Sequence, residues 1–289
     1  MDCHFDIFFL EALLNGVLLA GLLALLALGL NLVFGVIDVV WICYAELVMV
    51  GMYGIHFAYK GGMPFLLAVA VGILLVAAAA ALLHLLVIRP VLETPPINQL
   101  LVTGGVLFFL QAVATMAFGV EFRNLGISLG SYNLLDMSFS RSRILSFVIA
   151  LLGMVALWLF LKRTYLGTAI RAIAQDRQIM PLMGVDSKKI YLVTSSVGGG
   201  LAGLAAGLMV LNYDIYPQIG LQFGPLIFMI CVLGGLGNMI GGFAAAFIIS
   251  QFIAVGSSCF HTEWGYAVAF LFFMIAIFFR PQGLFGGKT

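Results

Sequence analysis

Charged side chains are scarce in this chain. Lys and Arg number 13 and Asp and Glu number 12 among 289 residues, which is 9% of the sequence. A soluble globular domain is about a quarter charged and roughly half apolar, whereas 63% of this chain is hydrophobic. So few polar groups cannot cover the surface of a water-soluble particle of this size. The composition therefore excludes a soluble protein and predicts one that lies in a lipid bilayer.

A strongly basic region, of the kind that binds nucleic acids, is also missing. The formal net charge is only +1, so no nucleic-acid partner is expected. The first residues, Met1 to Asp6, are acidic and lack the positive segment that opens a cleaved signal peptide. The first apolar segment is therefore expected to stay in the protein.

Groupings of reactive side chains are absent as well. The four cysteines are scattered without CxxC spacing, so they predict neither a zinc site nor a disulfide framework. No Ser-His-Asp set, paired carboxylates or metal-ligand cluster can be assembled from the sequence. We therefore expect no catalytic site, no metal and no cofactor. The cysteines are Cys3, Cys43, Cys231 and Cys259.

Long apolar segments are what the chain has in abundance. About 20 apolar residues cross the hydrocarbon core as a helix, and continuous runs without alternation exclude a membrane barrel. The sequence predicts a single all-α, polytopic membrane domain over residues 1–289 with about eight hydrophobic segments. They are 12–34, 36–58, 64–88, 98–119, 143–162, 191–212, 224–255 and 264–280.

The seventh segment, 224–255, is longer than one crossing needs. Glycines in its middle predict a helix break at membrane depth, of the kind that transporters place near their pathways. One tilted helix, a re-entrant hairpin and two short crossings all remain open. The glycines are Gly234, Gly235, Gly237 and Gly241.

Orientation follows from the cationic loops, which stay in the cytoplasm. The loop between the fifth and sixth segments carries six of the 13 Lys and Arg residues, so we expect it inside and the N-terminus outside. Arg280 near the C-terminus is expected inside too, which favours splitting the seventh segment. Arg123, Arg141 and Arg143 then face outward, against the rule. The six inner cations are Lys162, Arg163, Arg171, Arg177, Lys188 and Lys189.

Polar residues around the second segment are candidates for a solute path, because ionisable groups in a bilayer are costly and usually functional. Asn31 and Asp38 are seven residues apart, which would place them on one face of a continuous helix, and Tyr44 and Glu46 follow. The other interpretation puts Asp38 at the membrane edge and gives Glu46 a hydrogen bond to a neighbouring helix. Both interpretations stay open.

Three glycines spaced four apart, Gly199, Gly203 and Gly207, predict a smooth groove along one helix face. Another backbone can approach closely there. Packing within this chain is the leading interpretation, and a contact between subunits is the other.

The run "RAIAQDRQIMPLMGVDSKK" gathers six charges in an otherwise apolar chain. It predicts two short helices, one from Gly167 to about residue 179 and one that begins at Pro181. Apolar residues fall on one face and polar residues on another, which suits either a helix pair lying on lipid headgroups or a docking surface for a cytoplasmic protein. The apolar face has Ala169, Ile173 and Met180 with Met183 beside them; the polar face has Arg171, Gln175 and Gln178.

The same run resembles the signature region of the branched-chain amino-acid permeases of ABC importers. Other stretches are similar to that family along nearly the whole chain: "LGLNLVFGVIDVVWICYAELVMVGMY", "YPQIGLQFGPLIFMICVLGGLGNMIGG" and "RPQGLFG". The signature is matched by Arg171, Ala172, Ala174, Gln175, Asp176, Leu182, Met183, Gly184 and Val185.

The resemblance implies a permease fold related to that of ribose-type permeases, in the prokaryotic plasma membrane. A coupling loop at about 163–190 would fit a separate ATP-hydrolysing subunit, a homologous permease would share the solute path, and an external binding protein would deliver the solute. Branched-chain amino acids are the implied solutes, with urea, amides or small organic acids as alternatives. A stand-alone secondary transporter or channel is the alternative of another class, for which the coupling loop has no purpose.

Two stretches depart from the family pattern. The family usually has Asn-Phe-Ala-His-Gly-Glu where this chain has Trp41 to Glu46, and only the final Glu is kept. If that stretch lines the pathway, the solute is expected to differ from a standard branched-chain amino acid. Met180 and Pro181 stand where small residues are common, so the second half of the coupling loop is expected to bend differently.

Overall fold

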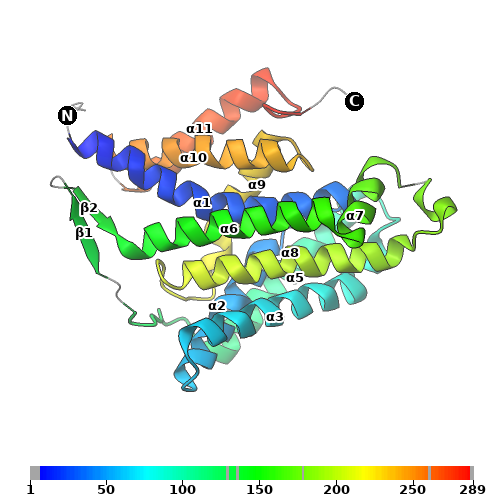
Figure 1. Cartoon of the computed structure of the whole chain (residues 1–289), viewed down its shortest axis with the longest axis horizontal. Helices are drawn as coiled ribbons and strands as arrows, with labels where there is room; N and C mark the ends of the chain where they lie inside the picture. The colour runs from blue at the N-terminus through cyan, green and yellow to red at the C-terminus, as the bar shows by residue number, and fades with distance from the viewer. Residues whose placement is uncertain (1–6, 128–129, 135–136, 178, 260–261, 287–289) are drawn as a thin grey trace.

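The computed structural model describes residues 7–127, 130–134, 137–177, 179–259 and 262–286, and helices make up most of them (Figure 1). The all-α prediction is confirmed. The long helices are α1 (Ile7–Ile37), α3 (Phe65–Leu83), α5 (Pro96–Phe118), α6 (Arg141–Arg163), α8 (Ser187–Met209) and α10 (Met239–Cys259). Shorter ones are α2 (Tyr44–Lys60), α7 (Tyr165–Gln175), α9 (Ile219–Gly234) and α11 (Thr262–Phe279).

Smaller elements join these helices. The π-helix η1 (His84–Ile88) and the single turn α4 (Arg89–Val91) extend α3, and the 3₁₀ turn η2 (Met180–Met183) precedes α8. Strands β1 (Ser131–Leu134) and β2 (Met137–Ser140) form an antiparallel hairpin in which Ser131 is opposite Ser140.

Six of the described helices are long and apolar enough to cross a membrane: α1, α3 with its extension, α5, α6, α8 and α10. The predicted seventh segment is two helices, α9 and α10, separated by a turn. Gly235 and Gly237 have φ angles of 92° and 81° in that turn, a left-handed conformation that glycine adopts without steric cost. Splitting the segment was one of the three options that the sequence left open.

The core is organised around α1, which runs through the molecule between α6 and α10 (Figure 1). Leu23, Leu25 and Leu26 of α1 are each 0% exposed although they point in different directions. Apolar side chains on every face suit a helix that other helices surround.

Helices α3 and α8 meet along the glycine groove. A Cβ atom at Gly203 would lie 2.7 Å from the Ile73 Cα, and one at Gly199 would lie 2.9 Å from the Val76 carbonyl oxygen. A Cβ atom at Gly207 would lie 2.9 Å from a methyl group of the Val69 side chain. The groove is thus filled by another helix of the same chain.

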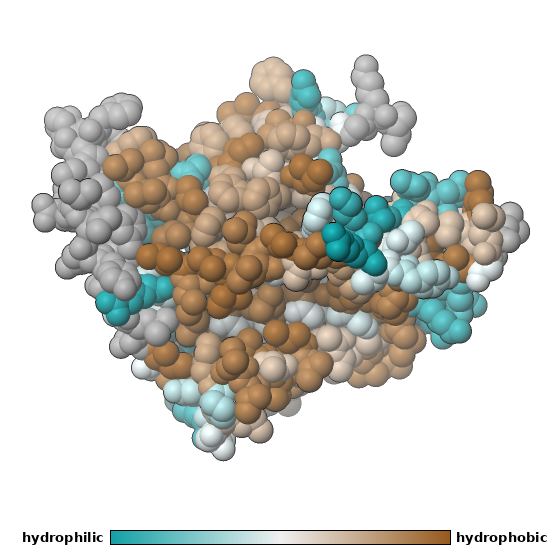
Figure 2. All heavy atoms as spheres, viewed as in Figure 1, coloured by the Kyte–Doolittle hydropathy of each residue, from teal (hydrophilic) through white to brown (hydrophobic). Residues whose placement is uncertain are grey.

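Large apolar side chains cover much of the outside (Figure 2). Leu66 of α3, Phe108 of α5 and Leu152 of α6 are 81%, 67% and 61% exposed. Such a surface is stable only against lipid or another membrane-embedded chain.

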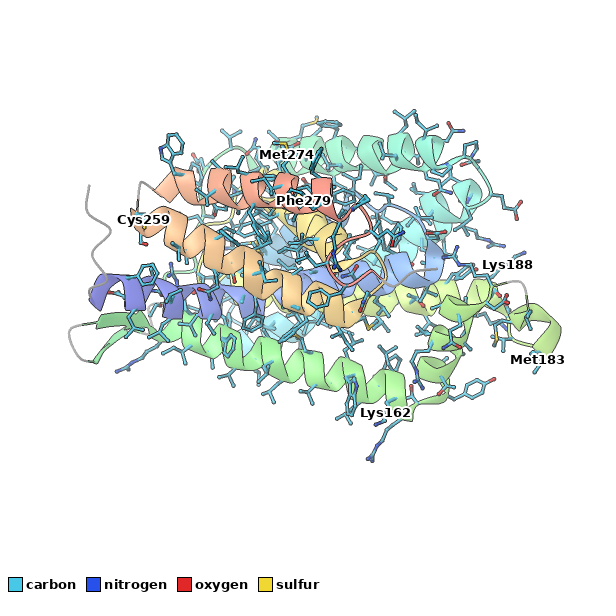
Figure 3. The ribbon with its side chains drawn as sticks, turned by 90° about the horizontal axis from the view of Figure 1, so that it is seen from above. Lys162, Met183, Lys188, Cys259, Met274 and Phe279 are labelled. Carbon is cyan, nitrogen blue, oxygen red and sulfur yellow. The ribbon has the colours of Figure 1, made fainter. Side chains whose placement is uncertain are left out.

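The two ends of the bundle differ in chemistry. Lys162, Met183 and Lys188 lie at one end and Cys259 at the other (Figure 3). We call the cationic end the inner end, following the positive-inside rule. The turn after α11 also lies there, because Leu284 N–H donates to the Leu233 carbonyl oxygen at 2.7 Å, beside the α9–α10 turn.

Arginines at the outer end are held by the protein itself. Arg123 donates to the Phe118 carbonyl oxygen at 2.7 Å, and Arg143 donates to Asn15 Oδ1 at 3.1 Å. Cys259, also at this end, is disulfide-bonded, a bond that the spacing of the cysteines did not predict.

Candidate functional site

Helix α7 presents one apolar and one polar face at the inner end. The Thr164 hydroxyl caps it by accepting from the Gly167 N–H at 2.9 Å. Ala169, Ile170 and Ile173 are buried, whereas Arg171 is exposed. The predicted first helix therefore exists, but it begins two residues earlier and ends at Gln175.

The second predicted helix is the four-residue 3₁₀ turn η2. Gly184 follows it with φ 80°, and the Asp186 carboxylate then caps α8 by accepting from the Lys188 and Lys189 N–H groups at 3.1 and 3.3 Å. These bonds, above all the one from Lys189, lower the pKa of Asp186. The Met183 side chain, 74% exposed, stands out at the tip. Gln178 and the side chain of Leu182 lie outside the described residues.

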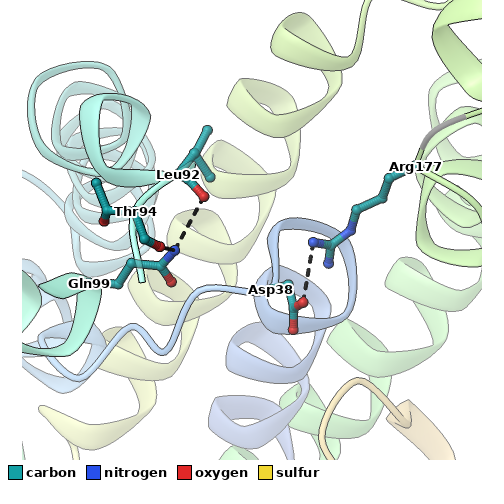
Figure 4. Close-up of polar contacts among 5 residues, drawn as sticks. All are labelled: Asp38, Leu92, Thr94, Gln99 and Arg177. Atoms are coloured by element: carbon teal, nitrogen blue, oxygen red, sulfur yellow. Dashed lines mark hydrogen bonds and ion pairs between the residues drawn. The ribbon is translucent and has the colours of Figure 1, made fainter. Parts of the chain in front are cut away.

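An ion pair ties this loop to the end of α1. Arg177 Nη1 lies 3.4 Å from Asp38 Oδ2 (Figure 4). Asp38 has φ 60° and is the one non-glycine residue with positive φ among those described, a conformation that Asp and Asn tolerate better than most residues. The side chains are 36% and 60% exposed, so the pair adds little stability. The pair is a direct contact between the loop after α7 and the residue that follows α1.

Residues 38–43 then return into the membrane without helical structure. The Thr103 hydroxyl of α5 donates to the Val40 carbonyl oxygen at 3.0 Å, and the Trp41 side chain is 1% exposed. The Tyr44 hydroxyl donates to the Gly198 carbonyl oxygen at 3.0 Å, at the midpoint of α8. Helix α2 therefore begins near the centre of the bundle.

Helix α9 begins beside α2. The segment 210–218 leads from the outer end of α8 to Ile219, and the next residue, Gly220, touches the Glu46 carboxylate. Two short helices thus start close together inside the bundle, each after a long helix and a non-helical segment. Transporters use such interrupted helices around their solute sites.

Glu46 is the most unusual side chain at this junction. It is 0% exposed, and neither carboxylate oxygen has a hydrogen-bond partner among the described residues. A buried carboxylate without a partner is costly. A group that persists at such a cost is a candidate for a functional role.

A cavity of about 310 Å³ borders the junction. Trp41, Tyr44 and Ala45 line it from one side, and Gly220, Gly224 and Phe228 line it from the other. Its walls are mostly apolar side chains, which suits an aliphatic group.

The four candidate path residues do not form one cluster. Tyr44 and Glu46 lie at the central junction, whereas Asp38 lies at the inner end on Arg177. The Asn31 side-chain carbonyl oxygen accepts a hydrogen bond from the N–H of Gly237, which lies in the α9–α10 turn, at 3.3 Å. Helix α1 ends at Ile37, so Asn31 and Asp38 do not share a helical face.

A second cavity, of about 600 Å³, opens at the outer end. It is more polar and has Glu11, Asn15 and Arg143 in its wall. Asn212 donates to the Ser146 hydroxyl at 2.8 Å within it. Nowhere in the described part of the chain do three His, Cys, Asp or Glu side chains gather to hold a metal ion.

Several residues that complete these contacts carry little signal in the sequence. Arg177 was part of the charged run but had no assigned partner, and Thr103, Gly198 and Gly220 were not candidates. The residues that they contact lie between 63 and 174 positions away in the sequence, so no local sequence pattern could predict these contacts. The one available signal was the family-like stretch that contains Gly220.

Comparison with known proteins places the chain in a family. The family described as "Branched-chain amino acid transport system / permease component" matches residues 12–277. The "High-affinity branched-chain amino acid transport system permease protein BraD" of Pseudomonas aeruginosa is 28% identical, over 96% of each chain. The corresponding permease protein LivH of Escherichia coli is 26% identical, over 97% of this chain and 96% of the relative.

A solved structure shares the fold. "PsaBC from Streptococcus pneumoniae in complex with Fab" superposes with a TM-score of 0.52 at 13% identity, covering 96% of this chain and 94% of that chain. At this identity the likeness shows the fold alone. Because the family match spans nearly all of the described bundle, this chain belongs to the permease components of branched-chain amino acid transport systems and is a multi-pass protein of the plasma membrane.

Proposed function

We propose that this chain is the permease subunit of an ABC importer that moves branched-chain amino acids across the plasma membrane, with ATP hydrolysed in separate subunits. The names of the relatives support the solute class. The observation that carries the mechanism is the Asp38–Arg177 ion pair, because it joins the cytoplasmic loop to the segment that leads into the bundle centre.

The loop from α7 to η2 is proposed to insert into an ATP-binding subunit. Tyr165, Ile179 and Met183 are 80%, 53% and 74% exposed on it, which is unusual for a segment outside the membrane. Arg171 is also exposed, on α7. Such a segment fits a docking contact in which apolar side chains anchor the partner and charges set the register. The other signature residues, Ala172, Ala174, Gln175, Asp176, Leu182 and Gly184, belong to the same proposed contact.

Movement of this loop would pass inward in two steps. Arg177 would carry it to Asp38, and the segment 38–43 would carry it to the first turn of α2 beside Glu46. A packed helix and a short tether transmit a displacement because interiors are not freely deformable.

The solute path is proposed to pass the α2–α9 junction. Tyr44 and Glu46 would border it at the centre, and Asn31 and Asp38 would lie toward its inner end. The Glu46 carboxylate suits the ammonium group of an amino acid, and the apolar cavity suits its side chain. A homologous permease would complete the path, and an external binding protein would deliver the solute.

Urea, amides or small organic acids are the second candidate solutes in the same machinery. The observation that favours them is that Trp41 and Tyr44, which line the central cavity, stand where the family has other residues.

Transport by the purified complex in proteoliposomes tests the proposal. Labelled leucine and labelled urea should be compared in the presence of the binding protein, with and without ATP. Arg171→Glu combined with Asp176→Lys should leave the complex assembled but uncouple ATP hydrolysis from uptake. Arg163→Glu, the control, should leave the complex assembled and uptake coupled to ATP hydrolysis. Accumulation of solute by this chain alone, without a nucleotide-hydrolysing partner, would contradict the proposal.

A further inference from the structure

A third cavity, of about 840 Å³, opens at the inner end of the bundle. The ends of α1 and α6, one face of α7 and the α9–α10 turn surround it. It is separate from the central cavity, because the two have no lining residue in common.

The charges in the wall have one sign. Lys162 and Arg171 line the cavity, and none of its described lining residues is Asp or Glu. Neither cation has an ion-pair partner among the described residues. The Lys162 ammonium lies 4.6 Å from the centre of the Trp158 ring, which is the contact that positions it.

Few polar side chains join the two cations in the wall. Gln175 adds an exposed amide that can donate a hydrogen bond. Asn238 also lines the wall, but its amide nitrogen donates to the Phe285 carbonyl oxygen at 2.9 Å and its carbonyl oxygen accepts from the Gly241 N–H at 3.0 Å. Asn31 is buried, and its amide nitrogen lies against Gly242. Two cations and one amide donor match a ligand that brings a negative charge and acceptor oxygens.

The remaining walls are apolar and continue onto the membrane-facing surface. Trp158 and Ile240 line the cavity and are 56% and 79% exposed. Trp is typical of the membrane–water interface. Lys162 lies in the last turn of α6, at the cationic end of the molecule (Figure 3). The cavity therefore opens at headgroup level, between an aqueous end and a hydrocarbon-facing wall.

We propose that this cavity binds the headgroup of an anionic phospholipid of the inner leaflet. The phosphate would lie between Lys162 and Arg171, and an acyl chain would run along the apolar wall past Trp158 and Ile240. Basic pockets between membrane helices on the cytoplasmic side recognise anionic lipids in this way. Because α7 forms one wall, the lipid would brace the loop that is proposed to meet the ATP-binding subunit.

Lipid titration of the full transport complex tests this. Delipidated complex in detergent is titrated with phosphatidylglycerol, phosphatidylcholine or inorganic phosphate, and thermal unfolding and native mass spectra are recorded. Phosphatidylglycerol should raise the unfolding temperature and stay bound, and phosphatidylcholine should do neither. Lys162→Gln should weaken the effect about fivefold in lipid concentration, as expected for one cation near a charged headgroup.

Arg163→Gln is the matched control, because Arg163 is the adjacent exposed cation and does not line the cavity. It should leave the lipid effect unchanged. Equal losses in the two variants would overturn the proposal, as would equal stabilisation by phosphatidylcholine. Stabilisation by inorganic phosphate alone would assign the cavity to a free anion instead. Leucine stabilisation that depends on Lys162 would make it the exit of the solute path, which also overturns the proposal.

Discussion

Glycine allows close contact in two regions of this molecule, and the two contacts differ in kind. In the α3–α8 groove, Gly203 meets the backbone of Gly72 and Ile73. At the α2–α9 junction, Gly220 meets the carboxylate of Glu46, which has no other partner among the described residues. The groove is explained by packing alone. The junction is not, because packing gives no reason to keep a carboxylate there.

The largest effect is expected in the groove. Gly203→Ala should destabilise the protein by about 1–3 kcal/mol, because the new Cβ would meet backbone atoms that cannot move aside. Gly200→Ala in the same helix is the control, since its nearest neighbour would be 4.0 Å away. Thermal unfolding in detergent measures both. Similar unfolding temperatures for the two variants would show that α3 does not fill the groove.

At the junction, a double-mutant cycle sharpens the comparison. Gly220→Ala should cost about 1–2 kcal/mol because its Cβ would overlap the Glu46 carboxylate. Most of this cost should vanish in a Glu46→Ala background, where the space is free. Thermal unfolding of the four proteins gives the coupling. Additive effects would mean that the contact between Gly220 and Glu46 is not made.

Glu46→Gln separates function from packing at the same place. The amide has the shape of the carboxylate without its charge, so stability should stay equal or rise. Leucine uptake should fall about tenfold if a charged hydrogen bond to the solute is lost, while assembly with the partner subunits is unchanged. Uptake kinetics in proteoliposomes decide the point. Unchanged uptake would make the junction a packing contact like the groove.

The smallest effect is expected at the Asp38–Arg177 ion pair, which connects the segment before the junction to the loop after α7. Asp38→Asn keeps a residue that tolerates φ 60° and removes the charge. Uptake per ATP hydrolysed should fall about threefold, within the range of an exposed ion pair. Arg177→Gln should match it.

Lys188→Gln, another exposed cation of the loop without an ion-pair partner among the described residues, is the control and should have no effect. If Lys188→Gln lowers the uptake per ATP hydrolysed as much as Arg177→Gln does, the net charge of the loop determines the coupling and the Asp38–Arg177 ion pair does not.

The parts of the fold that could be predicted are those that depend on a short stretch of sequence. The long apolar runs predicted the spans because helix length and apolarity alone decide whether a segment can cross a bilayer. The glycines at 234–237 predicted the break between α9 and α10 for the same local reason. The prediction of the second segment was less accurate. Residues 38–43 are mostly apolar and were predicted as part of a helix, yet they have no helical structure, and the Val40 carbonyl oxygen accepts from Thr103 of α5 instead.

The candidate site was predictable in part. Asn31, Asp38, Tyr44 and Glu46 were named because polar groups in a membrane segment stand out. Their separation into a central pair, a residue at the α9–α10 turn and a residue at the inner end depends on where α1 stops, and no local signal marks that point. Arg177 became informative only once its partner was known.

By itself, the sequence determined that this chain is a helical membrane protein with a cationic loop between two of its spans. Composition, the length of apolar runs and the distribution of charge are properties of the sequence alone, which is why no tertiary contact is needed to find them. Only the tertiary structure decided that Glu46 faces Gly220 and that Arg177 holds Asp38. It also decided that Lys162 and Arg171 share a cavity. These contacts join segments that are distant in the sequence, and they form because the whole bundle packs closely.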